Sequence, residues 1–434
     1  MHGDLNLYET NSVVGWVCLG LFVIAYLFVA TEEITKIRKS KPVILASCII
    51  WFLVAEVAVN DHGFSKEQVE SLIKHDLMDF SELLLFLLVS MTYTNALVER
   101  NVFKKIRYTL ICWGLNYRQL FWLTGFIAFF LSTVANNLTT AMVMGAVVLA
   151  CGKNNVEYIK LSFINIVIAA NAGGVFSPFG DITTLMVWQE GKIPFAGFFV
   201  LFIPALVNFV LPAAIFSFFI PPACPVAKME EPVKLKKGAV VIIFLFFITI
   251  SISVVCEEVL YIPPFMGMMM GLALLMFASY WLKKSNKNDS SYDVFSNVRD
   301  SEWDTLLFFY GIIFCIGGLK ELGYLELASH AIYDNLSFTW ANVFIGVLSA
   351  VVDNIPVMLS VLEMQPPMDL TQWLLVTLTA GVGGSLLSIG SAAGVALMGQ
   401  SKGLYTFIDH LKWLPVIVLG YCVSIYVHLL IASW

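Results

Sequence analysis

The chain has 434 residues, of which 59% are hydrophobic and 13% are charged, and its net charge is −6. Soluble proteins carry about 25% charged residues, so this composition and a mean hydropathy of +0.82 exclude a water-soluble globular protein. The absence of a basic tail excludes a nucleic-acid partner. We expect no cofactor, because the chain has no nucleotide-binding motif and no Cys–His metal cluster. We also expect no enzymatic activity, because no nucleophile–base pair is evident.

Apolar runs of about 20 residues, the length that crosses ~30 Å of hydrocarbon, recur along the whole chain. Strand alternation is absent, so we predict an all-α polytopic membrane protein. The first run lacks the basic residues of a signal peptide and is predicted to be retained. Clear examples of the runs are Val13–Ala30, Pro42–Val59, Glu82–Val98, Gly197–Phe219, Gly238–Cys256, Glu302–Leu319 and Trp413–Ser433.

The basic residues predict the orientation in the membrane. Six segments carry 21 of the 25 Lys and Arg residues, and by the positive-inside rule they are cytoplasmic. Two apolar stretches, 120–150 and 339–364, then begin and end on one side, so each is predicted to be a re-entrant hairpin. About ten transmembrane helices remain, with both termini periplasmic. The six basic segments are 31–41, 99–119, 152–160, 221–238, 282–302 and 400–412.

Three signals recur in the same order 210 to 220 residues apart. Ser81-Glu82 returns as Ser301-Glu302, Asn136-Asn137 as Asp353-Asn354, and Gly173-Gly174 as Gly383-Gly384. The predicted orientations of the two halves are opposite. We therefore predict two inverted-topology repeats, 1–220 and 238–434, joined by a cytoplasmic linker at 221–237, which is a common plan of secondary transporters.

Each half has two predicted breaks at membrane depth. Asn, Gly and Pro interrupt the hairpins at 132–140 and 349–356, and they interrupt two further helices, 160–188 and 371–399. Non-helical backbone in a membrane occurs only where it is buried in protein or lines a wet cavity. In transporters, such breaks bind ions.

Two aspartates, Asp181 and Asp353, lie in these breaks among hard oxygen ligands that suit Na⁺ or Li⁺. A buried carboxylate binds either H⁺ or Na⁺ but poorly both, which is the minimal mechanism of an antiporter. Structural roles stay open: Asp181 also suits a cap for a helix starting at Ile182, and the asparagines also suit broken backbone. The other candidate ligands are Ser132, Asn136, Asn137, Asn171, Thr183, Thr184, Ser349, Asn354, Ser388 and Ser391.

Three further residues are candidates for gating or for a pH response. Glu82 and Glu302 are predicted to begin spans, where the helix dipole also favours acidic residues. His75 precedes Glu82 in a polar external stretch, where a solvated histidine is the alternative.

The chain resembles the NhaD-type sodium/proton antiporters of the ion transporter superfamily. The resemblance covers nearly the whole chain and is carried by Ser81-Glu82-Leu-Leu-Leu-Phe, Asn137-Leu-Thr-Thr, Asn171-Ala-Gly-Gly, Pro178-Phe-Gly-Asp181-Ile-Thr-Thr184, Glu302-Trp, Asp353-Asn354-Ile-Pro and Ser388-Ile-Gly-Ser391. It implies Na⁺(Li⁺)/H⁺ exchange at alkaline pH, paired hairpins, a homodimer and a role for most of the candidate residues. The family pattern has Asp-Asn where this chain has Asn136-Asn137.

The predicted function is therefore a Na⁺(Li⁺)/H⁺ antiporter that expels sodium across a bacterial inner membrane by using the proton gradient. The alternative is a sodium-coupled dicarboxylate symporter of the same superfamily. Asp181 and Asp353 argue against it, because they would repel an anionic substrate. A membrane enzyme or a channel is a third class, but no nucleophile–base pair is evident and paired hairpins suit a carrier.

Overall fold

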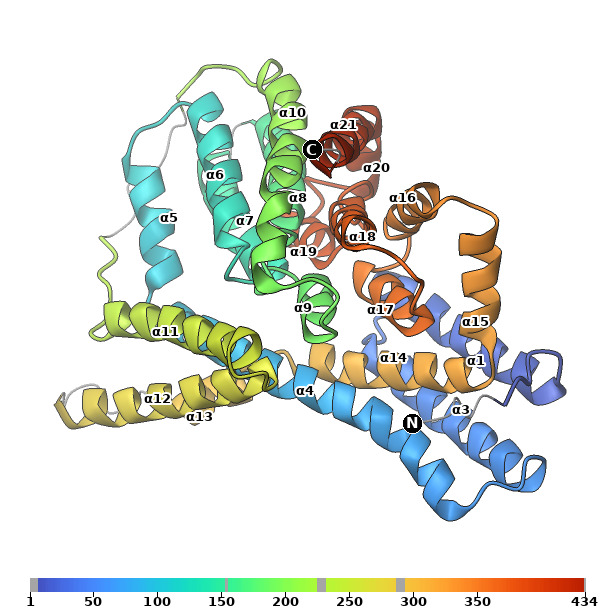
Figure 1. Ribbon diagram of the computed structural model, residues 1–434. Coiled ribbons are helices and arrows are strands. Elements are labelled where there is room, and N and C mark those ends of the chain that lie inside the picture. The colour runs from blue at the N-terminus through green and yellow to red at the C-terminus, as the bar shows by residue number, and fades with distance from the viewer. Residues whose placement is uncertain (1–6, 153–154, 225–231, 286–292, 433–434) are drawn as a thin grey trace. The chain divides into compact units, whose positions relative to one another are not determined.

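The computed structural model describes residues 7–152, 155–224, 232–285 and 293–432, and in these ranges its regular structure consists only of helices (Figure 1). The chain divides into two compact units. Unit 1 comprises Met1–Ala96, Val241–Asn335 and Leu359–Pro366, and unit 2 comprises Leu97–Val240, Leu336–Met358 and Pro367–Trp434. Part of the predicted linker at 221–237 lies outside the described residues. The units do not follow the predicted repeat boundaries, so the repeat stays a prediction.

Unit 1 is built on a packed group of helices in which α3 contacts both α1 and α14. Small residues permit this close approach, since a Cβ atom at Gly311 of α14 would stand 2.5 Å from Val43 of α3. The helices that lie wholly or mostly in this unit are α1 (Val13–Ala30), α2 (Glu32–Thr35), α3 (Ser40–Asn60), α4 (Lys66–Glu99), α11 (Ala239–Glu258), α12 (Pro264–Ser285), α13 (Val294–Arg299), α14 (Trp303–Glu321), α15 (Tyr324–Ser329) and the π-helix η2 (His330–Asp334).

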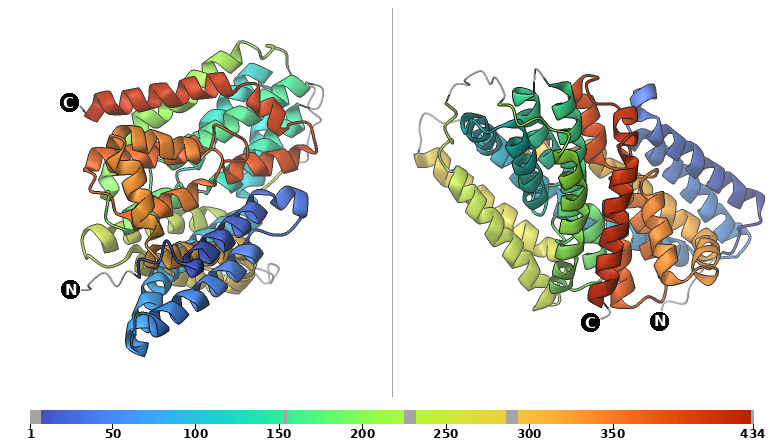
Figure 2. Two further views of the ribbon diagram at one scale, coloured as in Figure 1. Left: turned by 90° about the vertical axis from the view of Figure 1, so that its right-hand side faces the viewer. Right: turned by 90° about the horizontal axis from the view of Figure 1, so that it is seen from above.

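Unit 2 is centred on α8, whose residues from Leu161 to Gly174 are all buried. Helices α6, α7 and α10 pack against α8, and α10 also runs beside α21 (Figure 2). The helices are α5 (Val102–Cys112), α6 (Tyr117–Leu131), α7 (Asn137–Cys151), α8 (Val156–Gly174), α9 (Ile182–Gln189), the 3-10 helix η1 (Phe195–Leu201), α10 (Phe202–Ser217), α16 (Phe338–Leu348), α18 (Leu370–Gly383), α19 (Ala392–Ser401), α20 (Phe407–Leu411) and α21 (Leu414–Ala432). Helix α17 (Asn354–Met364) has residues in both units.

All four predicted breaks occur in the structure. Helix α6 ends at Leu131 and α7 begins at Asn137, while α8 ends at Gly174 and α9 begins at Ile182. The breaks at 349–353 and 384–391 follow α16 and α18 in the same way. Asn136 and Asp181 cap the helices that follow their breaks, because their side chains accept hydrogen bonds from the free N–H groups of the first turn.

The expectation that Glu82 begins a helix is wrong. Helix α4 starts at Lys66, and Glu82 therefore lies in its interior. Residues 66–80 are polar and therefore lie outside the apolar run that predicted the span. They are nevertheless helical, since Lys, Glu and Gln are good helix formers. His75, which was predicted to lie in a polar external stretch, is consequently part of this helix. Glu302 does precede a helix, as the N-cap of α14.

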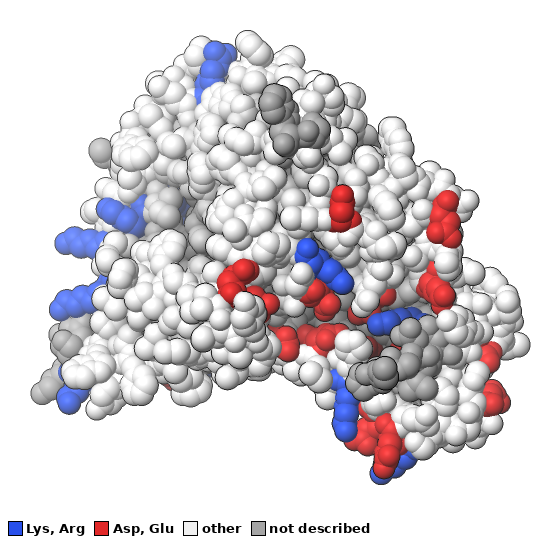
Figure 3. All heavy atoms as spheres, viewed as in Figure 1, with Lys and Arg blue, Asp and Glu red and all other residues white. Residues whose placement is uncertain are grey.

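Seven helical segments among the described residues are long and apolar enough to cross a membrane. Side chains such as Phe244 and Phe277 are more than half exposed on α11 and α12, as on a lipid-facing surface. Most of the face in Figure 3 is uncharged. The protein is a multi-pass membrane protein whose candidate spans are Ser40–Asn60, Lys66–Glu99, Phe195–Ser217, Ala239–Glu258, Pro264–Lys284, Trp303–Glu321 and Leu414–Ala432.

Candidate functional site

Asp181 is the centre of a polar cluster inside unit 2. It is the last residue of the break between α8 and α9, and its Oδ1 atom accepts a hydrogen bond from the N–H of Thr183 at 3.3 Å. The capping role that the sequence left open is therefore present. The positive end of the α9 dipole also favours a negative charge at this position.

Two asparagine side chains hold the other oxygen of Asp181. Its Oδ2 atom accepts hydrogen bonds from Nδ2 of Asn137 at 2.8 Å and from Nδ2 of Asn354 at 3.0 Å. Each asparagine is the first residue of the helix that follows a break, α7 in one case and α17 in the other. The structure thus brings two of the predicted breaks to one carboxylate, although Asn137 and Asn354 are 44 and 173 residues from Asp181 in sequence.

Asn137 connects Asp181 to a further set of predicted residues. Its Oδ1 atom accepts a hydrogen bond from the Ser132 hydroxyl at 2.5 Å, and its Nδ2 atom also lies 3.3 Å from Oδ1 of Asn171. The amide of Asn171, which is fully buried in α8, donates to Oγ of Ser391 at 3.0 Å. A buried network therefore extends from the break before α7 to the break before α19.

The two threonines after Asp181 are buried but have different surroundings. The Thr183 hydroxyl has no hydrogen-bond partner among the described residues. The Thr184 hydroxyl lies within hydrogen-bond distance of the backbone oxygens of Asp181 at 2.7 Å and Ser177 at 2.9 Å. Thr184 therefore stabilises the break, and Thr183 supplies a free oxygen at the base of α9.

Glycines allow the two breaks of the first half to touch. A Cβ atom at Gly180 would stand 2.7 Å from the backbone oxygen of Gly174 and 2.9 Å from that of Ser132. A Cβ atom at Gly174 would stand 2.9 Å from Oδ1 of Asn137. Larger residues at either position would push the break between α6 and α7 away from Asp181.

Asp353 and Asp181 interact electrostatically. Asp353 is partly buried and immediately precedes α17, and it lies close enough for its charge to act on Asp181. Among the described residues, Asp181 has no Lys or Arg partner. The carboxylates of Asp181 and Asp353 repel each other when both are charged. Binding of a cation or a proton would relieve this repulsion.

Three of the predicted ligands have other partners. The Ser349 hydroxyl donates to the backbone oxygen of Ala380 at 2.6 Å, and the Ser388 hydroxyl lies 3.3 Å from the sulfur of Met398. The side chain of Asn136 accepts from the N–H of Thr139 at 2.8 Å as a helix cap. Their direct contribution to the cluster stays a prediction.

The three candidates for gating or pH response all lie in unit 1. His75 and Asp79 form an i, i+4 pair on α4 at 3.4 Å, with the His75 side chain 62% exposed. Glu302 accepts a hydrogen bond from the Thr305 hydroxyl at 3.2 Å. Glu82 is partly buried in α4.

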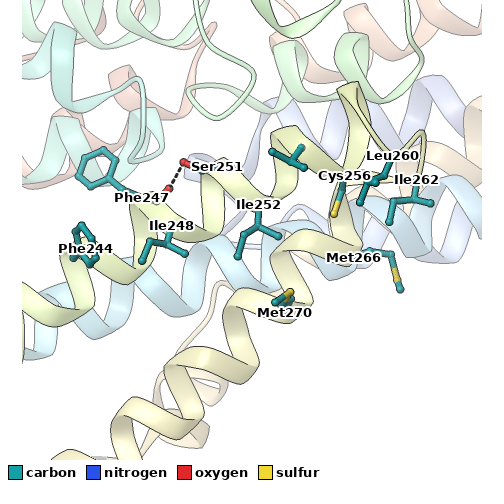
Figure 4. Close-up of a pocket in the computed structure, with 11 residues that line it drawn as sticks. Phe244, Phe247, Ile248, Ser251, Ile252, Cys256, Leu260, Ile262, Met266 and Met270 are labelled. Carbon is teal, nitrogen blue, oxygen red and sulfur yellow. Dashed lines mark hydrogen bonds between the residues drawn. The ribbon is translucent and has the colours of Figure 1, made fainter.

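An apolar groove in unit 1 does not suit a hydrophilic ion. It has a volume of about 660 Å³ and lies along α11 and α12, where its one polar side chain, Ser251, already donates to the backbone oxygen of Phe247 at 2.9 Å (Figure 4). Phe244, Ile252 and Met270 are among the other residues that line it. None of the described residues that line the groove carries a carboxylate.

Sequence reasoning missed the polar contacts that hold α20. Buried His410 contacts the Tyr405 hydroxyl through Nδ1 at 2.6 Å and the backbone oxygen of Ser385 through Nε2 at 2.9 Å. Burial lowers the pKa of His410 to about 4. Beside it, burial would raise the pKa of Asp409, but hydrogen bonds from Lys160 and Thr406 outweigh burial and lower it. Thr406 and Asp409 form a capping box, which a sequence motif could have indicated, whereas Lys160 is 249 residues from Asp409 and no motif indicated that contact.

Known proteins match this chain along most of its length. The family model described as "Citrate transporter" matches residues 26–383, a region that contains Asp181 and its three hydrogen-bond partners. A protein named Na⁺/H⁺ antiporter NhaD from Alkalimonas amylolytica is 52% identical, and the alignment covers 97% of this chain and 91% of that protein. Proteins of the same name from Vibrio cholerae and Halomonas elongata are 51% and 50% identical, and the alignments cover 97% and 99% of this chain and 93% and 90% of those proteins.

Proposed function

We propose, from the premise that this chain belongs to the family of NhaD-type Na⁺/H⁺ antiporters, that it is a secondary transporter that exchanges Na⁺ or Li⁺ for H⁺. It would use the proton gradient to expel sodium. The transported ions are its substrates, and it needs no cofactor.

The observation that carries this proposal is the environment of Asp181. Its carboxylate is held by two neutral amides, lies near a second carboxylate and has no Lys or Arg partner among the described residues. A permanent ion pair would prevent exchange, whereas a carboxylate held only by neutral groups can accept either a proton or a cation. Competition for this group couples the two ion flows.

The cluster also offers neutral oxygen ligands. Rotation of the Asn137 or Asn354 amide would replace an N–H donor with a carbonyl oxygen, and the Thr183 hydroxyl has a free oxygen. Hard cations such as Na⁺ prefer carboxylate, carbonyl and hydroxyl oxygens. We propose that Na⁺ binds at Asp181 and Asp353, with these three side chains as additional ligands.

The remaining candidates have supporting parts in this mechanism. Ser132, Asn171 and Ser391 orient Asn137, and Thr184 fixes the break. Ser349 and Asn136 hold the neighbouring backbone, and Ser388 contacts the sulfur of Met398. Glu82, Glu302 and His75 are proposed to act in gating or in the pH response.

We propose the finer architecture as two inverted repeats with ten spans and two re-entrant hairpins. Equivalent glycine contacts in the two halves support it. Gly180 packs on Gly174 and on the backbone oxygen of Ser132 at the first hairpin tip. A Cβ atom at Gly384 would stand 2.8 Å from the oxygen of Gly390, and one at Gly390 would stand 2.6 Å from the oxygen of Ala350 at the second tip.

The location follows from the family and from the basic loops. We propose that the protein lies in a bacterial inner membrane, with both termini periplasmic, and that it forms a homodimer. Its partners are the lipid bilayer and small cations.

The description of the matching family as citrate transporters favours a second candidate, a sodium-coupled dicarboxylate symporter. Such a carrier binds an anion. The neighbouring charges of Asp181 and Asp353 would repel an anion unless both were neutralised first, so we rank this function below antiport.

The test is a dye-based assay of proton movement in everted membrane vesicles that contain the full chain. We expect Na⁺ and Li⁺, added to vesicles with a preformed proton gradient, to release protons. A response to citrate or another dicarboxylate, with none to Na⁺ alone, would favour the symporter and contradict our proposal.

The assignment of the site is tested in the same vesicles. Asp181→Asn and Asp353→Asn should each abolish the Na⁺-dependent signal while the protein still reaches the membrane in normal amounts. Asp369→Asn is a matched control, because this aspartate caps α18 through a hydrogen bond from the N–H of Gln372 at 2.8 Å and asparagine is an equally good cap. Normal exchange by Asp353→Asn would refute its role.

A further inference from the structure

Asp76 of α4 is a buried carboxylate in unit 1 that the proposed function does not use. The residue is 8% exposed, and its Oδ2 atom has no hydrogen-bond partner among the described residues. Its carboxylate packs directly against Gly317 of α14, where any Cβ atom would collide with it. The missing side chain at residue 317 therefore makes the space that this carboxylate occupies.

Charged groups from three helices surround Asp76. Glu363 of α17, Asp79 and His75 of α4, and Glu321 of α14 are all close enough to act on it electrostatically. Lys320 of α14 acts on it as well. All these residues belong to unit 1.

The lysine of this cluster already has a partner. Nζ of Lys320 lies 2.7 Å from Oε2 of Glu363, and the two side chains are 28% and 15% exposed. His75 pairs with Asp79 in the same way when it is protonated. Four carboxylates thus share at most two positive charges, and Asp76 has neither of them as a direct partner.

The energetics favour a neutral Asp76. A buried carboxylate without a partner is destabilised by several kcal/mol, whereas a neutral acid with an unpaired oxygen is destabilised by about 1 to 3 kcal/mol. The nearby charges of Glu363, Asp79 and Glu321 add to the difference. A proton on Asp76 removes most of this cost.

We propose that Asp76 is a second proton-binding site, separate from the one at Asp181, and that Lys320 and Glu363 respond to its proton. When Asp76 loses the proton, its new charge competes with Glu363 for Lys320. Glu363 lies in the last turn of α17, the helix that begins with Asn354. Deprotonation would therefore weaken the anchor of a helix whose first residue binds Asp181.

The test measures the proton on Asp76 directly. Infrared spectra of the purified full chain, reconstituted in lipid, are recorded over a pH titration for wild type and for Asp76→Asn. We expect a carboxylic-acid C=O band that is present in wild type at low pH, lost on alkalinisation and missing from Asp76→Asn. Identical carboxylic-acid bands in the two proteins at every pH would overturn the proposal, and so would a wild-type band that Na⁺ removes at constant low pH.

Two further variants sharpen the test. Glu363→Gln removes one negative charge and frees Lys320 for Asp76, so the band should disappear at a pH lower by about 1 to 3 units. Glu70→Gln is the control, because Glu70 forms an exposed pair with Lys74 on the same helix, and it should leave the band unchanged. If Asp76→Asn does not fold, the shift in Glu363→Gln decides the question, and no shift overturns the proposal.

Transport measurements separate this inference from the proposed function. In vesicles, the rate of Na⁺-dependent proton release is measured as a function of pH. The step in this profile that is caused by titration of Asp76 should be missing in Asp76→Asn and should move to lower pH in Glu363→Gln. An unchanged profile in both variants would overturn the link to α17. Absence of Na⁺/H⁺ exchange in wild type would refute the proposed function, but it would leave the infrared result on Asp76 intact.

Discussion

Thr183 and Thr184 are adjacent in sequence and equally buried, yet their hydroxyls serve different purposes. A buried hydroxyl without a partner is destabilising by about 1 to 3 kcal/mol, and the Thr183 hydroxyl has no hydrogen-bond partner among the described residues. The Thr184 hydroxyl satisfies backbone oxygens of the break. This cost beside Asp181 supports our proposal that Thr183 is a ligand of the transported cation.

Valine substitutions separate the two threonines. Valine has nearly the same volume as threonine and lacks the hydroxyl. Thr183→Val should leave the melting temperature unchanged or raise it, and should raise the apparent Km for Na⁺ about tenfold, the equivalent of roughly 1.4 kcal/mol. Thr184→Val should lower the melting temperature, since it leaves carbonyl groups unsatisfied. Thermal denaturation and vesicle exchange measure both effects, and an unchanged Km in Thr183→Val would contradict its role as a ligand.

At the level of elements, the breaks were predictable and the helix around Glu82 was not. Asn136-Asn137, Gly173-Gly174 and Asp353-Asn354 are strong turn and cap residues inside apolar runs, and every one of them lies at a helix end. Residues 66–80 are polar, so hydropathy alone placed them outside a helix. Asp76 was missed for the same reason, although it lies seven residues before buried Leu83 and thus on the same helix face.

The contacts between breaks were not predictable, because they depend on tertiary structure. Nothing in the sequence indicates that Asn354 would reach Asp181, or that Asn171 would reach Ser391. The spacing of the glycines predicted where the helices are interrupted, but it did not predict which backbone atoms each glycine contacts. The sequence therefore identified candidate residues by their chemistry and by their position in a break, and only the structure shows which of them are in contact.

The packing of Gly180 leads to a prediction at this scale. A methyl group at this position would meet backbone oxygens of Gly174 and Ser132 at 2.7 and 2.9 Å, and backbone cannot move aside as a side chain can. Gly180→Ala should therefore destabilise the protein by about 1 to 3 kcal/mol and reduce exchange strongly by displacing Asn137.

The control for this variant is Gly399→Ala in α19, where a Cβ atom would meet no atom within 4 Å. This change should leave exchange unaffected and raise stability slightly, since alanine favours helix more than glycine. Both variants are compared by thermal denaturation and by the vesicle assay. Equal behaviour of the two would show that the close contact at Gly180 is unimportant.

The anchoring of α20 predicts a pH dependence of stability. The pKa of His410 is about 4 in the folded protein and about 6.5 when the chain is unfolded. As the pH falls below 6.5, the unfolded state binds the proton first, so the stability present at higher pH is lost progressively down to pH 4. At pH 5 the loss amounts to about 2 kcal/mol.

His410→Gln should reduce the drop in melting temperature between neutral pH and pH 5, because glutamine keeps both hydrogen bonds and does not titrate. His330 provides the control. It is exposed, and its hydrogen bond to Asp334 raises its pKa, so it contributes stability at low pH, in the opposite direction. His330→Gln should make the drop no smaller, and an equal reduction by both variants would contradict the assignment to His410.

At the scale of the whole molecule, the topology rests on the distribution of basic residues. Both flanks of 120–150 are basic, and a single crossing there would place one of them outside, against the positive-inside rule. If both apolar stretches were full spans, the chain would have twelve crossings instead of ten. An even number returns the C-terminus to the side of the N-terminus in either case, so the C-terminus alone cannot distinguish the two arrangements.

Reporter fusions in the linker at 221–237 do distinguish them. Five crossings from a periplasmic N-terminus place the linker in the cytoplasm, and six place it outside. We expect green fluorescent protein fused after residue 237 to be fluorescent and alkaline phosphatase at the same point to be inactive. Fusions after residue 434 should give the reverse result. Active phosphatase after residue 237, with the N-terminus outside, would mean that 120–150 crosses the membrane, and the first half would then lose its re-entrant hairpin and its symmetry with the second.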